Sequence, residues 1–238
     1  MPVTPVNSAL LFLMLISLKV ASQNIPVSPP PGVIRSIKVY KGLVKNNPAA
    51  GMTDVKKSMP GLMLDLRYAT KNNFMHQNLY PALTTTYLRR AAVQALDSVE
   101  KELRTVGLGL KIFDAYRPYS VTRKMWELIG DERYVANPAK GSGHNRGTTV
   151  DLTLVQLATG QELDMGTGFD NFSDTAHHTF THLPEEVLHN RKLLRTTMER
   201  HGFVALETEW WHYSLAGSGN YDLLDISFKK LKKLVSQN

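Results

Sequence analysis

The sequence predicts a single α+β domain with a central antiparallel or mixed sheet and helices packed against it. The chain has 238 residues, a length at which one domain is usual. Hydrophobic residues make up 42% of it, a fraction typical of an ordinary globular protein. Helical and alternating hydrophobic patterns follow one another without a regular strand–helix–strand repeat, so an antiparallel or mixed sheet is expected.

The amino-terminal part is predicted to lie outside that domain. Residues 9–18 read ALLFLMLISL, an apolar run that is too short to span a bilayer as a helix but typical of a signal peptide. Small residues up to Ser22 suit cleavage, whereas no Lys or Arg precedes Lys19, so an uncleaved amino terminus is the alternative. We expect a signal peptide over residues 1–22, a Pro-rich linker and N-terminal extension over 23–45, and the folded domain over 46–238. With such a leader the protein is expected to be exported, periplasmic or secreted, without a stable membrane anchor.

Hydrophobic periodicity predicts the first elements of the domain. The expected elements are a strand or loop over residues 64–68, a helix over 88–106, a strand over 108–116 and a helix over 120–130. Gly107 is a natural stop for the first helix, and Ser120 is a candidate cap for the second. The second helix is expected to turn Met125 and Leu128 inward.

The same patterns continue in the second half of the chain. The expected elements are a polar, Gly-rich loop over residues 141–147, a strand over 150–154, a helix over 184–202 and a last strand over 206–215. Pro184 marks the start of that helix and Gly202 its end. Four lysines near the carboxyl terminus, in ISFKKLKKLV, suit an amphipathic basic helix or the solvated face of a last helix, and we favour the solvated face.

Composition excludes several kinds of site. The chain has no cysteine, which rules out disulfides, thiolate zinc sites, iron–sulfur clusters and a cysteine nucleophile. Any metal must therefore be held by His, Asp or Glu. The formal net charge of +7 favours anionic surroundings such as cell-wall polymers or lipid head groups, but it is not a nucleic-acid signature, and no nucleic-acid partner is expected.

Three residues form a complete ligand set for a catalytic zinc ion. Such an ion takes three protein ligands, leaves one position open, and works with a carboxylate that serves as general base. His144, Asp151 and His212 supply the ligands, and Glu209 supplies the base. Residues three apart on a regular strand point to opposite faces, so Glu209 and His212 meet only if a bulge, turn or helical step separates them. Each spacing alone is common, and a hydrogen-bonded loop histidine beside an aromatic core strand is the alternative.

Arg117 is a further candidate for the chemistry. The motif Asp114-Ala115-Tyr116-Arg117-Pro118 ends a strand in a guanidinium at the rim of a sheet, where active sites often lie. Arginine stays charged and can donate two hydrogen bonds to one oxyanion or carboxylate. A surface ion pair with Asp114 is the alternative.

Five motifs taken together resemble the D-alanyl-D-alanine dipeptidases. The first two are Ser142-x-His144-x-x-Gly147-x-Thr149-x-Asp151 and the tetrad Glu209-Trp210-Trp211-His212. The others are residues 65–70 with Asn73-Phe74, residues 114–118, and residues 164–170 with His177-His178. These VanX-like zinc DD-peptidases share a fold with the hedgehog signalling domain, so the resemblance, which covers residues 55–215, implies that fold here.

The resemblance implies a role for each matched residue. His144, Asp151 and His212 look like the ligands of one zinc ion, Glu209 like the base that activates water, and Arg117 like the group that stabilises the oxyanion. Tyr68, Ser142 and Asp170 fall where the family holds the small dipeptide and its free ammonium. Each role suits the chemistry of its residue, since a carboxylate attracts an ammonium and a cation steadies an oxyanion.

Two positions depart from the family pattern. Thr149 stands where Ala is usual, and Gly143 stands where relatives can carry Ser. Neither is a ligand, so these departures bear on substrate selectivity rather than on the metal site. The neighbours His177 and His178 point apart, so at most one of them can approach the site, and neither is counted as a ligand.

The expected function is zinc-dependent hydrolysis of D-alanyl-D-alanine, or a similar D,D-dipeptide, to free D-amino acids in the turnover of cell-wall peptides. The expected partner is that small dipeptide, because Asp170 offers an acidic group to a free ammonium. One alternative is a zinc D,D-carboxypeptidase that acts on longer peptidoglycan peptides. The other is a zinc-containing binding module without catalysis, which would need neither Glu209 nor Arg117. The sequence indicates no oligomeric state.

Overall fold

The structure confirms the predicted α+β class. The computed structural model describes residues 32–236. Its helices are α1 (Ile37–Asn46), α2 (Val55–Ser58), α3 (Arg90–Arg104), α4 (Tyr119–Ile129), α5 (Gly143–Arg146), α6 (Glu185–Arg200) and α7 (Phe228–Val235). Its strands are β1 (Met52–Asp54), β2 (Met63–Leu64), β3 (Tyr87–Arg89), β4 (Leu108–Asp114), β5 (Thr149–Gln156), β6 (Phe203–Leu206) and β7 (Glu209–Leu215).

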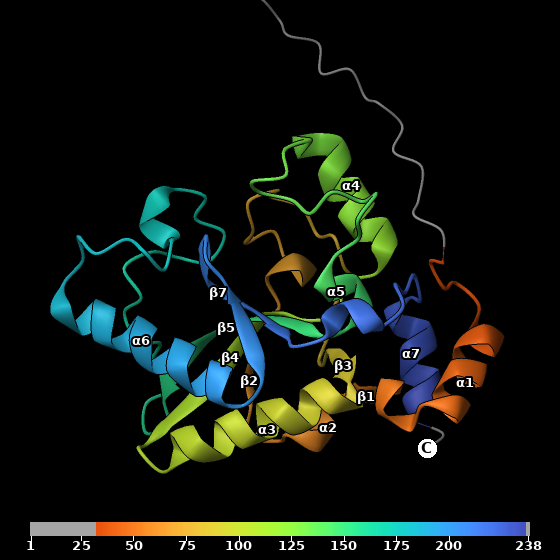
Figure 1. Cartoon of the computed structure of the whole chain (residues 1–238), viewed down its shortest axis with the longest axis horizontal. Helices are drawn as coiled ribbons and strands as arrows, with labels where there is room; N and C mark the ends of the chain where they lie inside the picture. Colours follow the sequence, from red (N-terminus) through yellow and green to blue (C-terminus); the bar gives the residue numbers. More distant parts are fainter. Residues whose placement is uncertain (1–31, 237–238) are drawn as a thin grey trace, which may run out of the picture.

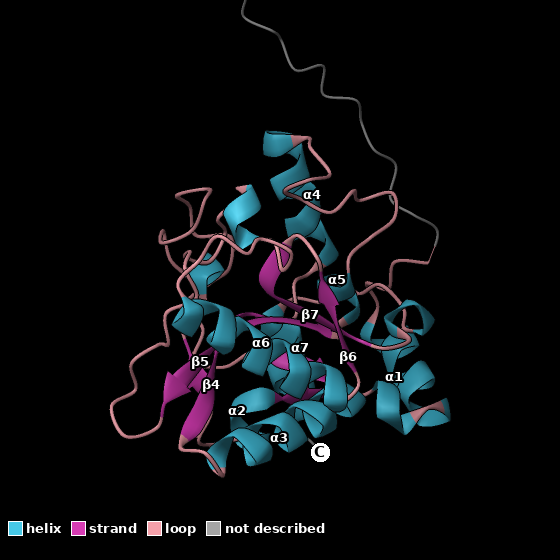
Figure 2. Cartoon of the chain, turned by 60° about the vertical axis from the view of Figure 1, so that its left-hand side comes forward, coloured by secondary structure: helices cyan, strands magenta, loops and turns pink. Residues whose placement is uncertain are grey.

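A five-stranded mixed sheet forms the centre of the molecule. Its strand order is β2-β4-β5-β7-β6, in which β2 and β4 run parallel and the other neighbours antiparallel. Helices α3 and α6 pack together against this sheet, while α4 and α5 lie on its other side (Figure 1). Figure 2 shows loops gathered on the side of α4 and α5, opposite α3. The predicted mixed sheet with packed helices is therefore confirmed, and its loop-rich side is the side open to a ligand.

Strand β5 separates the core from the loop-rich side. It is buried along most of its length. Val150, Leu152 and Leu154 belong to the core cluster that also holds the apolar faces of α3 and α6. The alternate residues, with Asp151 among them, point to the opposite face, because successive side chains of a strand alternate. One face of β5 thus stabilises the fold, and the other is available for chemistry.

The N-terminal extension takes part in the folded structure. Helix α1 is capped by Ser36 and buries Tyr40. Ile34 pairs with Leu224 in a short parallel bridge, and both residues belong to a second core cluster that includes the apolar face of α7. Packing therefore begins before residue 46, where the sequence predicts the start of the domain.

Two predicted elements of the second half differ in the structure. The single strand predicted over 206–215 is a hairpin, because two residues between Leu206 and Glu209 form a turn. The loop predicted over 141–147 contains the helical turn α5. Ser142 caps this turn, and Gly147 ends it with a φ of 71°, a conformation that favours glycine.

The first two long helices also differ in detail from their predictions. Helix α3 begins at Arg90, because Leu88 belongs to strand β3. Ser120 is the second residue of α4 rather than its cap. Met125 points inward as predicted, whereas Leu128 is exposed. Periodicity thus located both helices but not every residue of their buried faces.

The carboxyl-terminal lysines occupy the solvated face of a last helix, as predicted. Helix α7 buries Phe228, Leu231 and Leu234, and its lysines are exposed. Within residues 32–236, no helix is long and apolar enough to cross a membrane. The signal peptide predicted over residues 1–22 lies outside the described residues.

Candidate active site

Two of the predicted zinc ligands face each other across neighbouring strands. Asp151 of β5 and His212 of β7 are direct partners in the antiparallel register, and directly opposite residues point to the same face. Nδ1 of His212 accordingly lies 2.9 Å from Oδ1 of Asp151. Asp114 of β4 opposes Asp151 on its other side, because an extra residue, Phe113, shifts the β4–β5 register. A row of three polar residues therefore crosses the sheet.

His144 reaches Asp151 from the helical turn α5. Its Nε2 lies 3.3 Å from Oδ2 of Asp151, and its Nδ1 lies 2.7 Å from the carbonyl oxygen of Ala115. Only a protonated nitrogen can donate to a carbonyl, so Nε2 is left free to bind a metal. The backbone N–H of His144 also donates to Oγ of Ser142 at 3.2 Å. The ring is thus fixed both through its own nitrogen and through the cap of its helix.

The three residues fit a zinc ion. Their ligand atoms all lie within 4.8 Å of one another, and two imidazoles with one carboxylate are a donor set that zinc accepts. Burial alone would raise the pKa of Asp151, but His144 and His212 hold it well below its ordinary value, so this carboxylate stays charged. Its buried Oδ1 accepts no hydrogen bond of good geometry from the described residues. A buried, charged and unsatisfied acceptor between two imidazoles is the arrangement that a bound cation would complete.

Glu209 lies beside the ligands because β7 is bulged. The β6–β7 register changes between Ala205 and Leu206, which leaves the three residues after Glu209 without partners on β6. Oε2 of Glu209 lies 3.6 Å from Nδ1 of His212. The structure therefore meets the condition that the spacing of Glu209 and His212 imposed. Burial raises the pKa of Glu209 above its ordinary value, which makes its carboxylate a better proton acceptor.

Arg117 forms a buried ion pair with Asp114, and not the surface pair that was the alternative. Nε and Nη2 of Arg117 both donate to Oδ2 of Asp114, at 3.0 and 2.7 Å. Tyr80 donates to Oδ1 of the same carboxylate at 2.8 Å. Burial alone would lower the pKa of Arg117, but Asp114 raises it well above its ordinary value. A permanently charged guanidinium is therefore fixed with its Nη2 4.0 Å from Oδ2 of Asp151.

Tyr68 and Asp170 bring two loops to the same place. Tyr68 lies in a short 3₁₀ helix, Arg67–Ala69, and its hydroxyl donates to Oδ1 of Asp170 at 3.0 Å. The guanidinium carbon of Arg117 lies 5.0 Å from the centre of the Tyr68 ring, which connects this pair to the metal side. Oδ2 of Asp170 is buried and has no hydrogen-bond partner among the described residues. Burial, with Asp151 nearby, raises the pKa of Asp170 well above its ordinary value. A cationic ligand beside it would therefore strongly stabilise the charged carboxylate form.

All eight predicted site residues line one cavity of about 560 Å³. They are Tyr68, Arg117, Ser142, His144, Asp151, Asp170, Glu209 and His212. Three aromatic residues from different loops also line it, and the Phe172 ring lies 5.1 Å from that of Phe74 and 4.8 Å from that of Tyr134. A cavity of this volume suits a small molecule that is recognised by a few polar groups.

Comparison with known proteins now places the chain. The model of a family described as D-ala-D-ala dipeptidase, peptidase family M15, matches residues 48–231. The D-alanyl-D-alanine dipeptidase of Escherichia coli (strain K12) is 35% identical over 177 residues, which cover 74% of this chain and 91% of the relative. The enzyme of the same name from Enterococcus faecalis (strain ATCC 700802 / V583) is 32% identical over 184 residues, 69% of this chain and 91% of the relative. The chain belongs to the D-Ala-D-Ala dipeptidase family.

Solved structures that resemble the chain are more distant in sequence than these members of the D-Ala-D-Ala dipeptidase family. The LD-carboxypeptidase LdcB is 18% identical with a TM-score of 0.38, and the match covers 66% of this chain and 69% of that one. A mutant of the vancomycin-resistance D,D-pentapeptidase VanY, in complex with Zn(II), is 16% identical with a TM-score of 0.36. That match covers 66% of this chain and 82% of the other.

The structure links the two departures from the pattern of the D-Ala-D-Ala dipeptidase family. A Cβ atom at Gly143 would collide with Oγ1 of Thr149. That hydroxyl lies 2.6 Å from Oγ of Ser214 in the neighbouring strand β7. Thr149 therefore occupies the space that a side chain at position 143 would need, and the two departures compensate for each other directly behind His144.

The cavity also depends on contacts that the sequence patterns did not indicate. Tyr80 and the carbonyl of Ala115 hold Asp114 and His144 in place, and neither contact has a signal in local spacing. The spacing of Asp114 and Arg117 was visible, but it gave no sign that the pair is buried. His177 lines the cavity and His178 does not, which confirms that at most one of these neighbours approaches the site.

Proposed function

We propose that this protein is a zinc-dependent dipeptidase that hydrolyses D-alanyl-D-alanine or a similar D,D-dipeptide. One observation carries the proposal: a single cavity holds the cluster of possible zinc ligands, the carboxylate of Glu209 and Oδ2 of Asp170. Within residues 32–236, this Oδ2 atom has no hydrogen-bond partner. A free dipeptide has an ammonium group, and Asp170 is its chemical complement. Family membership supports the substrate class, because the similar relatives are named D-alanyl-D-alanine dipeptidases.

Each residue of the site has a separate role in the proposed reaction. His144, Asp151 and His212 would hold one zinc ion, whose chemical contribution is to polarise the scissile carbonyl as a Lewis acid. Glu209 takes a proton from the attacking water and returns it to the leaving amine, and its raised pKa suits both transfers. Arg117, fixed by Asp114, stabilises the negative charge that develops on the carbonyl oxygen.

The remaining predicted residues hold the substrate. Oδ2 of Asp170 receives the free ammonium, while the hydroxyl of Tyr68 keeps this carboxyl in place through Oδ1. Ser142 lies at the cavity wall, where its hydroxyl is shared between the cap of α5 and the substrate. In this arrangement the substrate lies between an anionic end at Asp170 and a cationic group at Arg117.

The substrate assay compares free D-Ala-D-Ala with its N-acetylated form. Acetylation removes the positive charge and adds bulk against a carboxylate, and loss of one member of a buried charge pair costs about 3–5 kcal/mol. We expect kcat/KM to fall at least about a hundredfold. In Asp170→Asn the difference in kcat/KM between the free and the acetylated dipeptide should narrow, because the attraction specific to the ammonium is gone. A D,D-carboxypeptidase would prefer the acylated or longer peptide, and equal rates on both substrates would reject the dipeptidase proposal.

The metal assay measures zinc by elemental analysis. The native protein should bind one zinc ion per chain, whereas His144→Ala and His212→Ala should lose most of it, because three ligands cannot be reduced to two without a large loss of affinity. His189→Ala, which changes an exposed histidine of α6, is the matched control and should retain zinc. Full zinc in both ligand variants would reject the site. Zinc binding without any hydrolysis would favour the binding module.

We propose further that the protein is exported, to the periplasm or outside the cell. There it would hydrolyse dipeptides that come from the turnover of cell-wall peptides, and its products would be free D-amino acids. The apolar run of residues 9–18 and the small residues before Gln23 support export. Fractionation followed by amino-terminal sequencing tests it. The exported protein should begin near Gln23, and an intact amino terminus on all of the protein, retained inside the cell, would contradict export.

A further inference from the structure

The net charge of the protein comes from two short segments. Residues 33–58 and 222–236 contain ten of the 28 basic residues but only three of the 21 acidic ones. In the rest of the chain, 18 basic residues are balanced by 18 acidic ones. The whole formal net charge of +7 therefore arises from these two segments, which are far apart in the sequence.

The fold joins these two segments into one end of the molecule. The backbone N–H of Ile34 donates to the carbonyl of Leu223 at 2.8 Å, and Arg35 pairs with Asp225 at 3.4 Å. Tyr40 of α1 and Phe228 of α7 belong to the same core cluster. Helices α1 and α7 accordingly lie at the same end of the molecule in Figure 1. Segments almost 200 positions apart in the sequence thus form one continuous surface.

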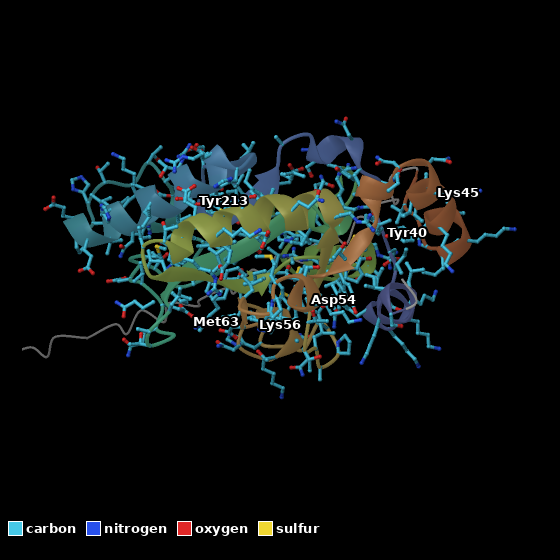
Figure 3. All side chains as sticks on the ribbon, turned by 90° about the horizontal axis from the view of Figure 1, so that it is seen from below. Tyr40, Lys45, Asp54, Lys56, Met63 and Tyr213 are labelled. Atoms are coloured by element: carbon cyan, nitrogen blue, oxygen red, sulfur yellow. The ribbon has the colours of Figure 1, made fainter. Side chains whose placement is uncertain are left out.

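The lysines of both helices point outward from this end. Lys38, Lys41 and Lys45 recur at helical spacing along α1 and are exposed, and Figure 3 shows Lys45 projecting outward while Tyr40 lies on the inner side. On α7, the exposed lysines are Lys229, Lys230, Lys232 and Lys233. We call these seven lysines the basic surface.

The basic surface is not neutralised by acidic side chains. None of its seven lysines forms an ion pair with a residue in the described range 32–236. Some exposed lysines elsewhere do have acidic partners: Lys101 pairs with Asp97 at 2.6 Å, and Lys140 with Glu132 at 2.7 Å. None of the seven lysines lines the catalytic cavity. The surface therefore has its own unbalanced field, separate from the active site.

We propose that the basic surface docks the protein on an anionic phospholipid bilayer. Lysine ammonium groups act as point charges on phosphate, and each lysine near an anionic membrane strengthens binding roughly fivefold. The exposed hydrophobic side chain among them is Val39, which suits the edge of a lipid head-group layer and offers no ring for base stacking.

Sedimentation with lipid vesicles tests the proposal on the full chain. One vesicle type is phosphatidylcholine alone, and the other contains about one third phosphatidylglycerol. The readout is the ratio of the two partition constants, in which any contact of residues 9–18 with neutral lipid cancels. We expect a ratio above about one hundred at about 0.1 M salt, falling to near one at about 0.5 M, where charges are screened within a few ångströms.

Two variants and one control assign the effect to residues. Replacing Lys38, Lys41 and Lys45 by Gln should lower the ratio at least about tenfold, and replacing the four lysines of α7 by Gln should lower it at least as much. The control replaces Lys71, Lys124 and Lys192, exposed lysines outside both segments, and should leave the ratio unchanged. The thermal unfolding temperature and hydrolysis of D-Ala-D-Ala should stay near normal in all three. Because each helix is changed separately, a fold defect in one variant leaves the other as a test.

The possible outcomes distinguish the bilayer from other polyanions. Preference for anionic vesicles that both helix variants lose and the control keeps supports the proposal. A ratio near one for the native chain overturns it, as does an equal loss in the control. Soluble polyphosphate is added as a competitor, and a native chain that binds polyphosphate but shows no preference for anionic vesicles would assign the surface to a soluble polyanion instead.

Discussion

The proposed metal side and the proposed substrate side of the cavity are built in different ways. On the metal side, Asp151 and His212 are partners on adjacent strands, and His144 stands on a capped helical turn. On the substrate side, Tyr68 and Asp170 come from loops 102 positions apart and meet through one hydrogen bond. The sheet therefore sets the geometry of the proposed metal ligands, whereas side-chain contacts must hold Tyr68 and Asp170.

Arg191 of α6 holds the loop that carries Asp170. Its guanidinium donates to the backbone carbonyls of Met165, Thr175 and His177, at 2.8, 2.9 and 3.2 Å, on both sides of Asp170 in the chain. Hydrogen bonds from a buried guanidinium thus hold this loop in place, whereas strand pairing holds Asp151 and His212. Because the two sides are held by different contacts, metal content and substrate affinity should respond to different substitutions.

Removal of the base should give the largest effect and leave both sides intact. In Glu209→Gln the amide has nearly the same size but cannot accept a proton, so turnover should fall about 10²–10⁴-fold while zinc content and KM stay normal. Steady-state kinetics and elemental analysis check this. Glu207→Gln, in the neighbouring turn, is the control, because its carboxylate pairs with Arg195 outside the cavity. Loss of zinc from Glu209→Gln would show that Glu209 belongs to the ligand set.

Arg191→Met should damage the substrate side alone. Three carbonyls lose a charged donor, which we expect to lower the free energy of unfolding by about 3 kcal/mol and to raise KM for the dipeptide, with zinc still bound. Denaturant unfolding, kinetics and metal analysis measure these quantities. Arg195→Met on the same helix is the control, since its surface ion pairs are worth about 1 kcal/mol at most. If Arg191→Met also loses zinc, the two sides are one cooperative unit.

Gly143→Ala should damage the metal side alone, by a smaller amount. The new Cβ collides with Thr149, and overpacking of this kind costs about 1–3 kcal/mol. Zinc affinity should fall, because His144 is the next residue on the same turn. Thr149→Ala removes the obstructing hydroxyl and should restore zinc binding in the double variant. Independent, additive effects in this double-mutant cycle would refute the compensation between the two positions.

Acid should lower the stability of the protein through His178, which precedes β7 in the chain. Burial, aided by the charge of Arg195, lowers the pKa of His178 to about 4. Between about pH 6.5 and 4, the unfolded chain therefore binds a proton at this histidine that the folded chain does not. The free energy of unfolding is accordingly highest above about pH 6.5 and falls as the pH drops toward 4. We expect a loss of about 2 kcal/mol, allowing for the partly solvated ring. His178→Gln should flatten unfolding free energy against pH in this window, and exposed His189→Gln should not.

Much of the fold could be predicted because its signals are local. Helix α6 begins after Pro184 and ends before Gly202, as the sequence indicated, because helix ends are set by a few adjacent residues. The hairpin turn after Leu206 was missed, since its two residues, Glu207 and Thr208, include no Gly, Pro, Asn or Asp that would mark a break. The exposed Leu128 shows the same limit, because periodicity marks a helix face but not the neighbour that covers it.

Residue types and local spacing were enough to identify the groups that could do the chemistry. It supplied two imidazoles and a carboxylate for zinc, a further carboxylate in Glu209, and motifs specific enough to identify the family. These are properties of residue type and spacing, and they do not depend on how distant parts of the chain pack.

How those groups meet depends on contacts between distant parts of the chain. The register that sets Asp151 opposite His212, the bulge that turns Glu209 toward them, and the buried Asp114 that fixes Arg117 all depend on pairing between distant segments. So does the basic surface, whose two halves are far apart in the sequence but adjacent in the fold. Strand register and packing are chosen by the free energy of the whole core, so no local window of sequence contains them.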